Sequence, residues 1–128
     1  MLQQPIITTK KSSGENECRR VLENIFNLPF ISSRPDFLKN PITKSYNLEL
    51  DCYNKDLHLA VEYNGKQHYE YTPYFHKSMD AFRNQQYRDD IKKRLCLENN
   101  VNLIIIPYTV KISNIKQFLI KELKKINS

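Results

Sequence analysis

Apolar side chains recur with helical spacing near the start of the chain. We therefore expect a helix over residues 14–27, preceded by a loosely held polar tail over residues 1–13. Prolines interrupt residues 28–47, which predicts a loop with one short strand over residues 30–33. The apolar positions of the helix fall at i, i+3, i+4, i+7 and i+8: Cys18, Val21, Leu22, Ile25 and Phe26.

Further along the chain the pattern changes between strand and helix periods. Two alternating runs, residues 48–53 and 57–63, predict a β-hairpin. A second helix is expected over residues 78–99, and the run VNLIIIP at 101–107 has the composition of a strand buried on both faces. Because the second helix is long enough to be a crossover, this strand should lie parallel to one hairpin strand. A last amphipathic helix over residues 115–126 completes an α/β fold, a central mixed sheet flanked by helices.

Composition limits the domain count and the class of partner. With 128 residues and 40% hydrophobic composition, the chain can bury one core, so residues 14–128 are expected to form a single domain. The excess of 20 Lys and Arg over 14 Asp and Glu favours a polyanionic partner, although it also fits a merely solvated surface. The cysteines at 18, 52 and 96 lack metal or disulfide spacing, and no run approaches the roughly 18 apolar residues of a membrane span. We expect a soluble, intracellular protein with small core cysteines.

Two acids on the hairpin carry the candidate chemistry. Residues of one parity share a face of a strand, and a two-residue turn at Lys55-Asp56 would set Asp51 and Glu62 on one face in diagonal positions. Their Cβ atoms would then lie roughly 7 Å apart. Two carboxylates this close repel unless a cation lies between them, and such oxygen ligands suit Mg²⁺ or Mn²⁺. The alternative is that both acids are ordinary solvent-facing residues.

Two further features leave alternatives open. Glu15 lies at the edge of the apolar helical stripe and needs a partner, which would be either a metal ion or the capping-box arrangement of Ser12-x-x-Glu15. The loop over residues 65–77 mixes cations with tyrosine and phenylalanine. Its rings would either stack on bases or pack into a small satellite core.

Several of these segments, taken in order, resemble the PD-(D/E)XK nuclease superfamily. The matching residues are LELD ending at Asp51, EYNGKQHY beginning at Glu62, RDxxK ending at Lys92, and the IPY that closes the last strand. The pattern is similar to that of small restriction-endonuclease-like proteins of large DNA viruses, and it covers residues 14 to about 110. The resemblance implies a restriction-endonuclease-like αβββαβ core, here with an extra C-terminal helix, and metal-dependent hydrolysis of DNA phosphodiester bonds.

The resemblance also implies roles for individual residues. Three acids would bind Mg²⁺ or Mn²⁺: Asp51, Glu62 and Glu15. Three further side chains would complete the catalytic site: Gln67, His68 and Lys92. Candidate nucleic-acid contacts are Arg34, Lys39, Lys66 and Arg88, for which surface solubility is the alternative. The motif lysine is replaced by Asn64, so Gln67 or Lys92 would have to take over its role.

The partner expected from the resemblance is double-stranded or branched DNA, in the nucleus or cytoplasm of a host cell if the protein is viral. A homodimer is left open. Two rival functions follow from the same residues. One is a nuclease-fold module that binds nucleic acid without cutting it, which the loss of the motif lysine to Asn64 favours. The other is cleavage of RNA, which the sequence does not exclude.

Overall fold

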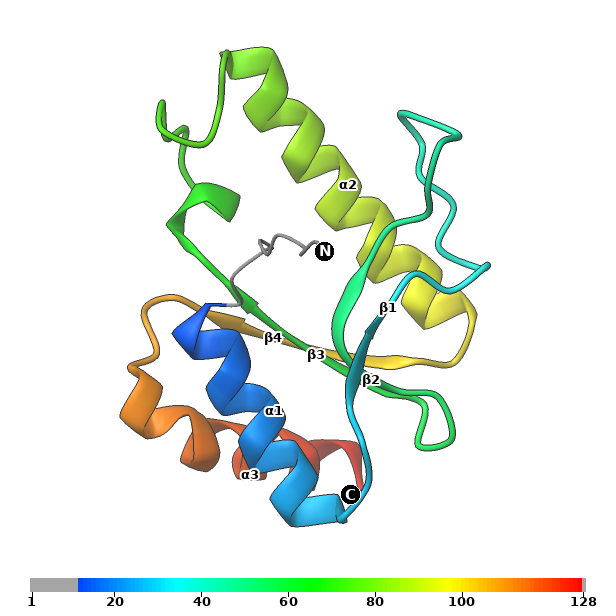
Figure 1. Cartoon of the computed structure of the whole chain (residues 1–128), viewed down its shortest axis with the longest axis vertical. Helices are drawn as coiled ribbons and strands as arrows, with labels where there is room; N and C mark the ends of the chain where they lie inside the picture. The colour runs from blue at the N-terminus through cyan, green and yellow to red at the C-terminus, as the bar shows by residue number, and fades with distance from the viewer. Residues whose placement is uncertain (1–11, 128) are drawn as a thin grey trace, which may run out of the picture.

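The computed structural model describes residues 12–127 as a four-stranded mixed β-sheet with helices packed on both faces (Figure 1). This is the α/β class that the sequence predicts. Within the described range, no helix is both long and apolar enough to cross a membrane. The elements in chain order are α1 (Ser13–Phe26), β1 (Ile31–Ser33), β2 (Leu50–Asn54), β3 (Leu59–Asn64), the 3₁₀ helix η1 (Lys66–His68), α2 (Met79–Glu98), β4 (Asn102–Pro107), η2 (Ile112–Asn114) and α3 (Ile115–Ile126).

Side-chain caps determine where the two longer helices begin. The Ser12 side chain accepts a hydrogen bond from the Glu15 N–H at 3.0 Å, and the Ser78 side chain accepts one from the Ala81 N–H at 3.1 Å. Each cap satisfies a backbone donor that has no partner within its helix. Ser12 and Ser13 therefore belong to the start of α1 and not to the predicted tail. The rest of that tail, residues 1–11, lies outside the described residues.

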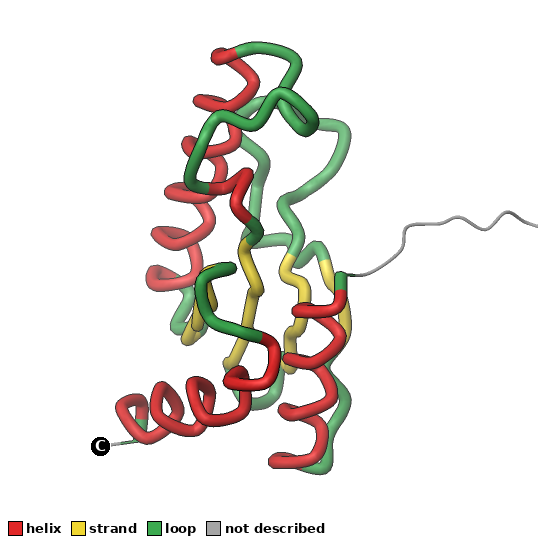
Figure 2. The backbone as a smooth tube through the Cα atoms, turned by 90° about the vertical axis from the view of Figure 1, so that its left-hand side faces the viewer, coloured by secondary structure: helices red, strands yellow, loops and turns green. Residues whose placement is uncertain are grey.

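The sheet has the strand order β1-β2-β3-β4, with antiparallel pairs up to β3 and a parallel pair between β3 and β4. Helix α2 connects β3 to β4, so the predicted crossover and the parallel pairing are confirmed. Figure 2 shows the strands lying between α1 and α2. The two faces of the sheet are thus covered by different helices.

Strand β4 is an edge strand, which corrects the prediction that it is buried on both faces. Ile104 and Ile106 are buried, whereas Leu103 and Ile105 are only half-buried and Asn102 is exposed. The continuous apolar run predicted burial on both faces, but one face of β4 packs on the core while the other is only partly covered. Alternating burial of this kind is typical of a strand with one solvated side.

The turn between β2 and β3 is longer than predicted. Asn54 pairs with Leu59, so residues 55–58 form a four-residue connection. The side-chain oxygen of Asn54 accepts a hydrogen bond from the Leu57 N–H at 3.0 Å, an interaction typical of asparagine in turns. His58 takes a φ of 52°, in the left-handed region. The turn contains no glycine that would have indicated this conformation in the sequence.

The longer turn changes the geometry of the two hairpin acids. A two-residue turn at Lys55 and Asp56 would have set Asp51 diagonal to Glu62. Extending the observed pairing by one residue instead sets Asp51 directly opposite Glu62. Directly opposed residues have Cβ atoms roughly 4.5–5.5 Å apart, closer than the diagonal arrangement.

Strand β2 also carries a β-bulge where it meets β1. Ile31 pairs with Tyr53, and Ser33, two residues further along β1, pairs with Leu50, three residues back along β2. One extra residue of β2 therefore lies opposite β1. Simple alternation predicted Leu50 and Cys52 on one face and Tyr53 on the other. Instead Leu50 and Tyr53 pack together beneath α2, while Cys52 faces α1.

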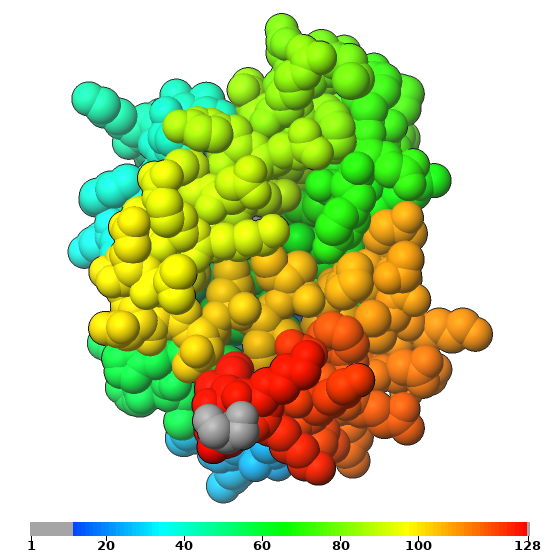
Figure 3. Space-filling model, turned by 180° about the vertical axis from the view of Figure 1, so that it is seen from behind, coloured from blue at the N-terminus to red at the C-terminus, as the bar shows by residue number. Residues whose placement is uncertain are grey.

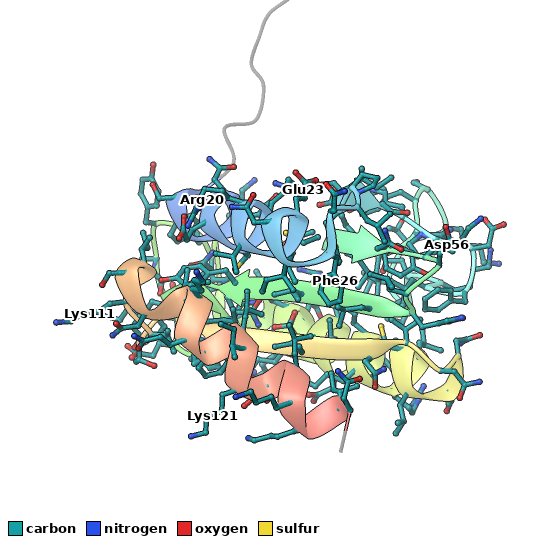
Figure 4. The ribbon with its side chains drawn as sticks, turned by 90° about the horizontal axis from the view of Figure 1, so that it is seen from below. Arg20, Glu23, Phe26, Asp56, Lys111 and Lys121 are labelled. Atoms are coloured by element: carbon teal, nitrogen blue, oxygen red, sulfur yellow. The ribbon has the colours of Figure 1, made fainter. Side chains whose placement is uncertain are left out.

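Two apolar clusters hold the layers together, one on each face of the sheet. In Figure 4, Phe26 of α1 is directed toward the strands, while Arg20 and Glu23 lie on the outer side of the helix. The cluster beneath α1 and α3 includes Cys18, Val21, Leu22, Phe30, Cys52, Leu59, Val61, Ile104, Ile106, Ile115 and Leu119. The cluster beneath α2 consists of Leu38, Leu48, Leu50, Tyr53, Ala60, Ile91, Cys96 and Val101.

Helix α2 covers the sheet with only part of its length. In the sequence, one side of this helix is marked by Tyr87, Ile91, Leu95 and Glu98. Ile91 and Leu95 do pack in the second cluster, but Tyr87 and Glu98 are exposed. The first half of α2 extends beyond the ends of the strands, as Figure 1 shows, so its side chains have no sheet to cover.

The cysteines are buried and free, as predicted for small core residues. Burial raises the pKa of the Cys18 and Cys52 thiols to about 12 and that of Cys96 to about 11. Since the thiolate is the reactive form, these side chains are chemically quiet at neutral pH. They serve packing.

Gly14 provides a stability prediction for the contact between α1 and β3. A Cβ at this position would overlap the ring of Tyr63, whose hydroxyl donates to the carbonyls of Tyr108 (3.4 Å) and Val110 (3.3 Å). Helix propensity alone favours Gly14→Ala by about 1 kcal/mol. We expect the opposite sign, a loss of about 1–3 kcal/mol in urea unfolding, because the ring has to move.

The matched control for Gly14→Ala is Ser13→Ala, an exposed position in the same helical turn. Its effect should stay within about 0.5 kcal/mol. A gain in stability for Gly14→Ala would show that the Tyr63 ring moves aside at little cost.

Candidate active site

Glu62 of β3 forms a buried ion pair with Lys92 of α2. The Lys92 Nζ lies 2.8 Å from the Glu62 Oε2, and the two side chains are only 15% and 6% exposed. Burial lowers the pKa of the lysine ammonium, but the charge of Glu62 and the hydrogen bond to it outweigh burial, so the pKa of Lys92 lies above its ordinary value. A charged lysine is therefore fixed against a carboxylate inside the fold.

Asp51 lies across the β2–β3 ladder from Glu62, at the bulge of β2. Burial raises the pKa of its carboxyl to about 7, with the negative charges of Glu62 and Glu15 adding to the effect and Lys92 opposing it. The ionised form of Asp51 is thus unfavourable in this protein. A cation bound between the carboxylates would stabilise it.

Arg19 connects α1 to the strand that bears Asp51, and sequence reasoning missed it. Its Nη2 lies 3.1 Å from the Glu15 Oε2 and donates to the Asp51 carbonyl oxygen at 2.6 Å, while its Nε donates to the Phe30 carbonyl at 2.8 Å. The available signal was the i,i+4 spacing of Glu15 and Arg19 at the edge of the apolar stripe. Of the alternatives for Glu15, the Ser12 half of the capping box is present, and the carboxylate meets Arg19.

The three acids expected to bind metal are only partly brought together. Among residues 12–127, no group of three or more His, Cys, Asp or Glu side chains is arranged so that it could hold a metal ion. The predicted three-acid centre is therefore not assembled in this structure. Asp51 and Glu62 lie opposite each other, whereas the Glu15 carboxylate pairs with Arg19. The oxygen donors and mutual repulsion of Asp51 and Glu62 fit a hard divalent cation.

His68 is held by α2. Its Nδ1 lies 2.9 Å from the Asp89 Oδ2, and the Gln85 amide nitrogen lies 3.4 Å from the same ring nitrogen. The spacing of Arg88, Asp89 and Lys92 leaves two arrangements open: an ion-paired cluster on a solvated helix, or a stripe packed over the acidic face of the hairpin. Asp89 and Lys92 reach across to η1 and β3, so α2 packs with this stripe toward the strands. A carboxylate that orients an imidazole is an arrangement suited to proton transfer.

Two cavities border this part of α2. Gln67 and Arg88 share a cavity of about 350 Å³, whose other lining residues are Phe75, His76, Ala81, Asn84 and Gln85. Arg88 lies one helical turn from Lys92. Asn64, at the position of the motif lysine, is buried and lines a second cavity of about 320 Å³ together with His68 and Asp89.

The other predicted nucleic-acid contacts lie outside this cluster. Arg34 donates to the Asn47 carbonyl at 2.6 Å within its own loop, and Lys39 lines an adjoining cavity of about 380 Å³. Lys66 pairs with Glu70 on the surface at 3.7 Å. The structure thus groups five of the predicted catalytic residues around α2 and β3, and it leaves Arg34 and Lys39 on a separate loop.

No family model and no solved structure matches the chain significantly. The chain is 54% identical over 118 residues to uncharacterized protein 033L of Invertebrate iridescent virus 3, an alignment that covers 92% of this chain and 60% of the relative. It is 49% identical over 131 residues to uncharacterized protein 307L of Invertebrate iridescent virus 6, an alignment that covers 91% of this chain and 66% of the relative. It is 43% identical over 102 residues to uncharacterized protein 094L of Frog virus 3, an alignment that covers 79% of this chain and 65% of the relative. The chain spans about 60 to 66% of the length of these relatives.

Proposed function

We propose that this chain is a Mg²⁺- or Mn²⁺-dependent DNA endonuclease with a restriction-endonuclease-like core, in which Asp51 and Glu62 hold the ion and Lys92 supplies the catalytic lysine. The observation that carries the proposal is the buried pair of Lys92 and Glu62. A solvated helix would have left Lys92 in water. Here the lysine instead reaches across from α2 to an acid that faces a second carboxylate, Asp51.

The order of elements supports the proposal. From α1 to β4 the chain runs helix, three strands, helix, strand, which is the order that the resemblance to PD-(D/E)XK nucleases implies. The two acids lie on the second and third strands, with the lysine on the helix that follows. Because the relatives are viral proteins, the proposed nuclease would act on DNA in the nucleus or cytoplasm of an infected cell.

Lys92 would replace the lysine that the motif places at Asn64. Position 64 is occupied by a buried amide, whereas the Lys92 ammonium already lies 2.8 Å from the second acid. From there it would hold an attacking water or a phosphate oxygen by a charge-assisted hydrogen bond. A divalent ion bound by Asp51 and Glu62 would stabilise charge on the phosphate and favour ionisation of water.

His68 would move a proton in the same site. With Nδ1–H donating to Asp89, the other ring nitrogen, Nε2, is the basic one. Asp89 would fix this tautomer and stabilise the imidazolium form, as an orienting carboxylate does in other hydrolases. Glu15 would act only through Arg19, which positions the Asp51 backbone.

The experiment is a cleavage assay with the full chain on linear, mismatched and branched DNA and on RNA of matched sequence. We expect strand cleavage of DNA with Mg²⁺ or Mn²⁺, complete loss of cleavage in EDTA, and recovery when the metal is added back. Cleavage in EDTA that equals cleavage with metal would contradict the proposal.

Two other outcomes would replace it. Tight DNA binding without cleavage by the wild type would favour the binding module, which the buried amide at Asn64 already suggests. Preferential cutting of the RNA substrate would leave the chemistry in place but change the substrate class.

A further inference from the structure

Two aromatic rings project from the loop that connects η1 to α2. Tyr74 is 88% exposed and Phe75 is 58% exposed, and the rings contact each other edge to face with centroids 4.9 Å apart. Figure 3 shows this loop in green at one corner of the molecule, beside the first turns of α2. The sequence left open whether these rings pack in a satellite core, and for Tyr74 and Phe75 the structure places them on the surface. Adjacent exposed rings of this size are typical of binding surfaces.

A buried polar network holds the loop in shape. His76 is 4% exposed, and its Nδ1 accepts a hydrogen bond from the Thr72 N–H at 3.0 Å. Its Nε2 therefore carries the proton and donates to the Gln85 Oε1 at 2.7 Å. Tyr71 stacks on the His76 ring, and the Phe82 and His76 rings contact each other edge to face. The rings of residues 74 and 75 are thus displayed by an anchored turn.

The surroundings of the two rings suit a nucleic acid. Of the four cationic side chains from Gly65 to Arg88, Lys66 pairs with Glu70 and Arg83 pairs with Asp80, which leaves Lys77 and Arg88 as the candidates for phosphate contacts. Phe75 also lines the cavity that Gln67 and Arg88 share. That cavity runs along α2 toward Lys92, so the exposed rings and the candidate active site lie along one helix face.

We propose that Tyr74 and Phe75 stack on unpaired bases, so that the substrate is DNA containing unstacked nucleotides and not a continuous duplex. Aromatic side chains bind any exposed base through its π-face, and cations beside them hold the backbone. Wedges of this kind also separate neighbouring base steps. The inference about cutting rests on the proposed function, whereas the inference about stacking does not need it.

Helix geometry gives the separation along α2 between the cavity that Phe75 lines and Lys92. Gln85 lines the same cavity as Phe75 and is seven residues from Lys92 along α2. At 1.5 Å per residue this separation is about 10 Å, the length of about three base steps of a DNA strand. For a strand that follows this helix, cleavage should therefore fall within a few nucleotides of the unpaired region.

The test compares an intact duplex with the same duplex carrying a short central bubble, using the full chain and Asp51→Asn to prevent cutting. Binding is followed by fluorescence anisotropy, and stacking by quenching of 2-aminopurine placed in the bubble. We expect the bubble to bind about tenfold more tightly than the duplex, with strong quenching. The double variant Tyr74→Ala/Phe75→Ala should lose the preference and the quenching but keep its affinity for the duplex.

Three comparisons make the result specific. Tyr74→Trp/Phe75→Trp should retain the preference, because tryptophan also stacks. Tyr87→Ala removes another exposed tyrosine, from α2, and should change nothing. Equal melting temperatures would show that the variants stay folded. No bubble preference in the wild type, or a preference that survives in the double alanine variant, overturns the proposal.

The two proposals fail in different ways. Bubble preference with quenching, but no cleavage by wild type with Mg²⁺, would support the stacking surface and reject the nuclease. Metal-dependent cleavage at equal rates on duplex and bubble, unchanged by Tyr74→Ala/Phe75→Ala, would reject the stacking surface and support the nuclease.

Discussion

Asp51→Asn is expected to stabilise the metal-free protein at pH 8 while abolishing metal-dependent cleavage. Burial and the charges of Glu62 and Glu15 raise the pKa of Asp51 from 3.8 to about 7, so ionising this carboxyl in the folded state costs free energy. Asparagine has nearly the same shape and no charge to bury. We expect a gain on the order of 2–4 kcal/mol in the free energy of unfolding.

The pH dependence follows from the direction of that shift. Because the folded state holds the Asp51 proton more tightly, wild-type stability from this group is fully present below about pH 4 and is lost as pH rises to about 7. Above pH 7 the loss is complete and constant. Asp51→Asn lacks this decline, so the two stability curves should meet near pH 4 and lie furthest apart at pH 8.

Urea unfolding in EDTA at several pH values measures this difference. Asp56→Asn, an exposed acid in the β2–β3 turn, is the matched control and should track the wild type. Added Mg²⁺ should raise the melting temperature of the wild type at pH 8 but not that of Asp51→Asn. Only the ionised carboxyl of the wild type binds the ion, and binding to the folded state stabilises it. If Asp51→Asn is less stable than the wild type at pH 8, or cuts DNA at the wild-type rate, the role given to Asp51 is wrong.

The elements of the fold were largely predictable, because each follows from local periodicity. The stripe from Cys18 to Phe26 marks α1, and the length of α2 marks β4 as parallel. The registers between the strands were harder to predict from the sequence. The four-residue turn depends on a positive φ at His58, a position where no glycine indicates it, and the bulge of β2 depends on its pairing with β1. Neither leaves a clear mark in the sequence.

In the candidate site, too, the features that follow from local sequence were predictable and those that depend on packing were not. Asp51 and Glu62 were identified from strand parity and resemblance, and the observed register, extended by one residue, sets them opposite each other instead of diagonal. Whether Lys92 meets the acidic face of the hairpin or stays in solvent was left open, and the pairing of Asp89 with His68 was not predicted. Both depend on how α2 is rotated about its own axis when it packs on the sheet. A helix with a clear apolar stripe would have indicated that rotation. On α2, exposed Tyr87 interrupts the stripe.

Lys92→Met is expected to slow the chemical step of cleavage by about a hundredfold while also destabilising the protein. The ammonium would be lost from a site where a positioned charge or proton donor typically contributes that factor. The Glu62 carboxylate would be left buried without its cation, which typically costs about 3–5 kcal/mol. The rate is measured in single turnover at saturating enzyme, at a temperature where circular dichroism shows the variant folded.

A double-mutant cycle separates the two effects of the lysine. Glu62→Gln/Lys92→Met removes both charges, so most of the stability lost in Lys92→Met should return, with a coupling energy well above about 0.5 kcal/mol. Cleavage should not return, since both the acid and the lysine are needed for chemistry. Lys121→Met is the matched control, because Lys121 is an exposed lysine on a different helix, α3. Its stability and rate should stay at the wild-type values.

Asn64→Lys on the Lys92→Met background tests whether the two positions are equivalent. If Lys92 carries out the role that the motif gives to a lysine at position 64, a lysine at position 64 should recover part of the lost rate. The ion pair between Lys92 and Glu62 would still be absent. An unchanged single-turnover rate in Lys92→Met would remove the lysine from the mechanism and leave Gln67 as the remaining candidate. A rate loss that Glu62→Gln/Lys92→Met reverses would show that neither charge is needed for chemistry, and that the loss in Lys92→Met comes from the unpaired Glu62 carboxylate.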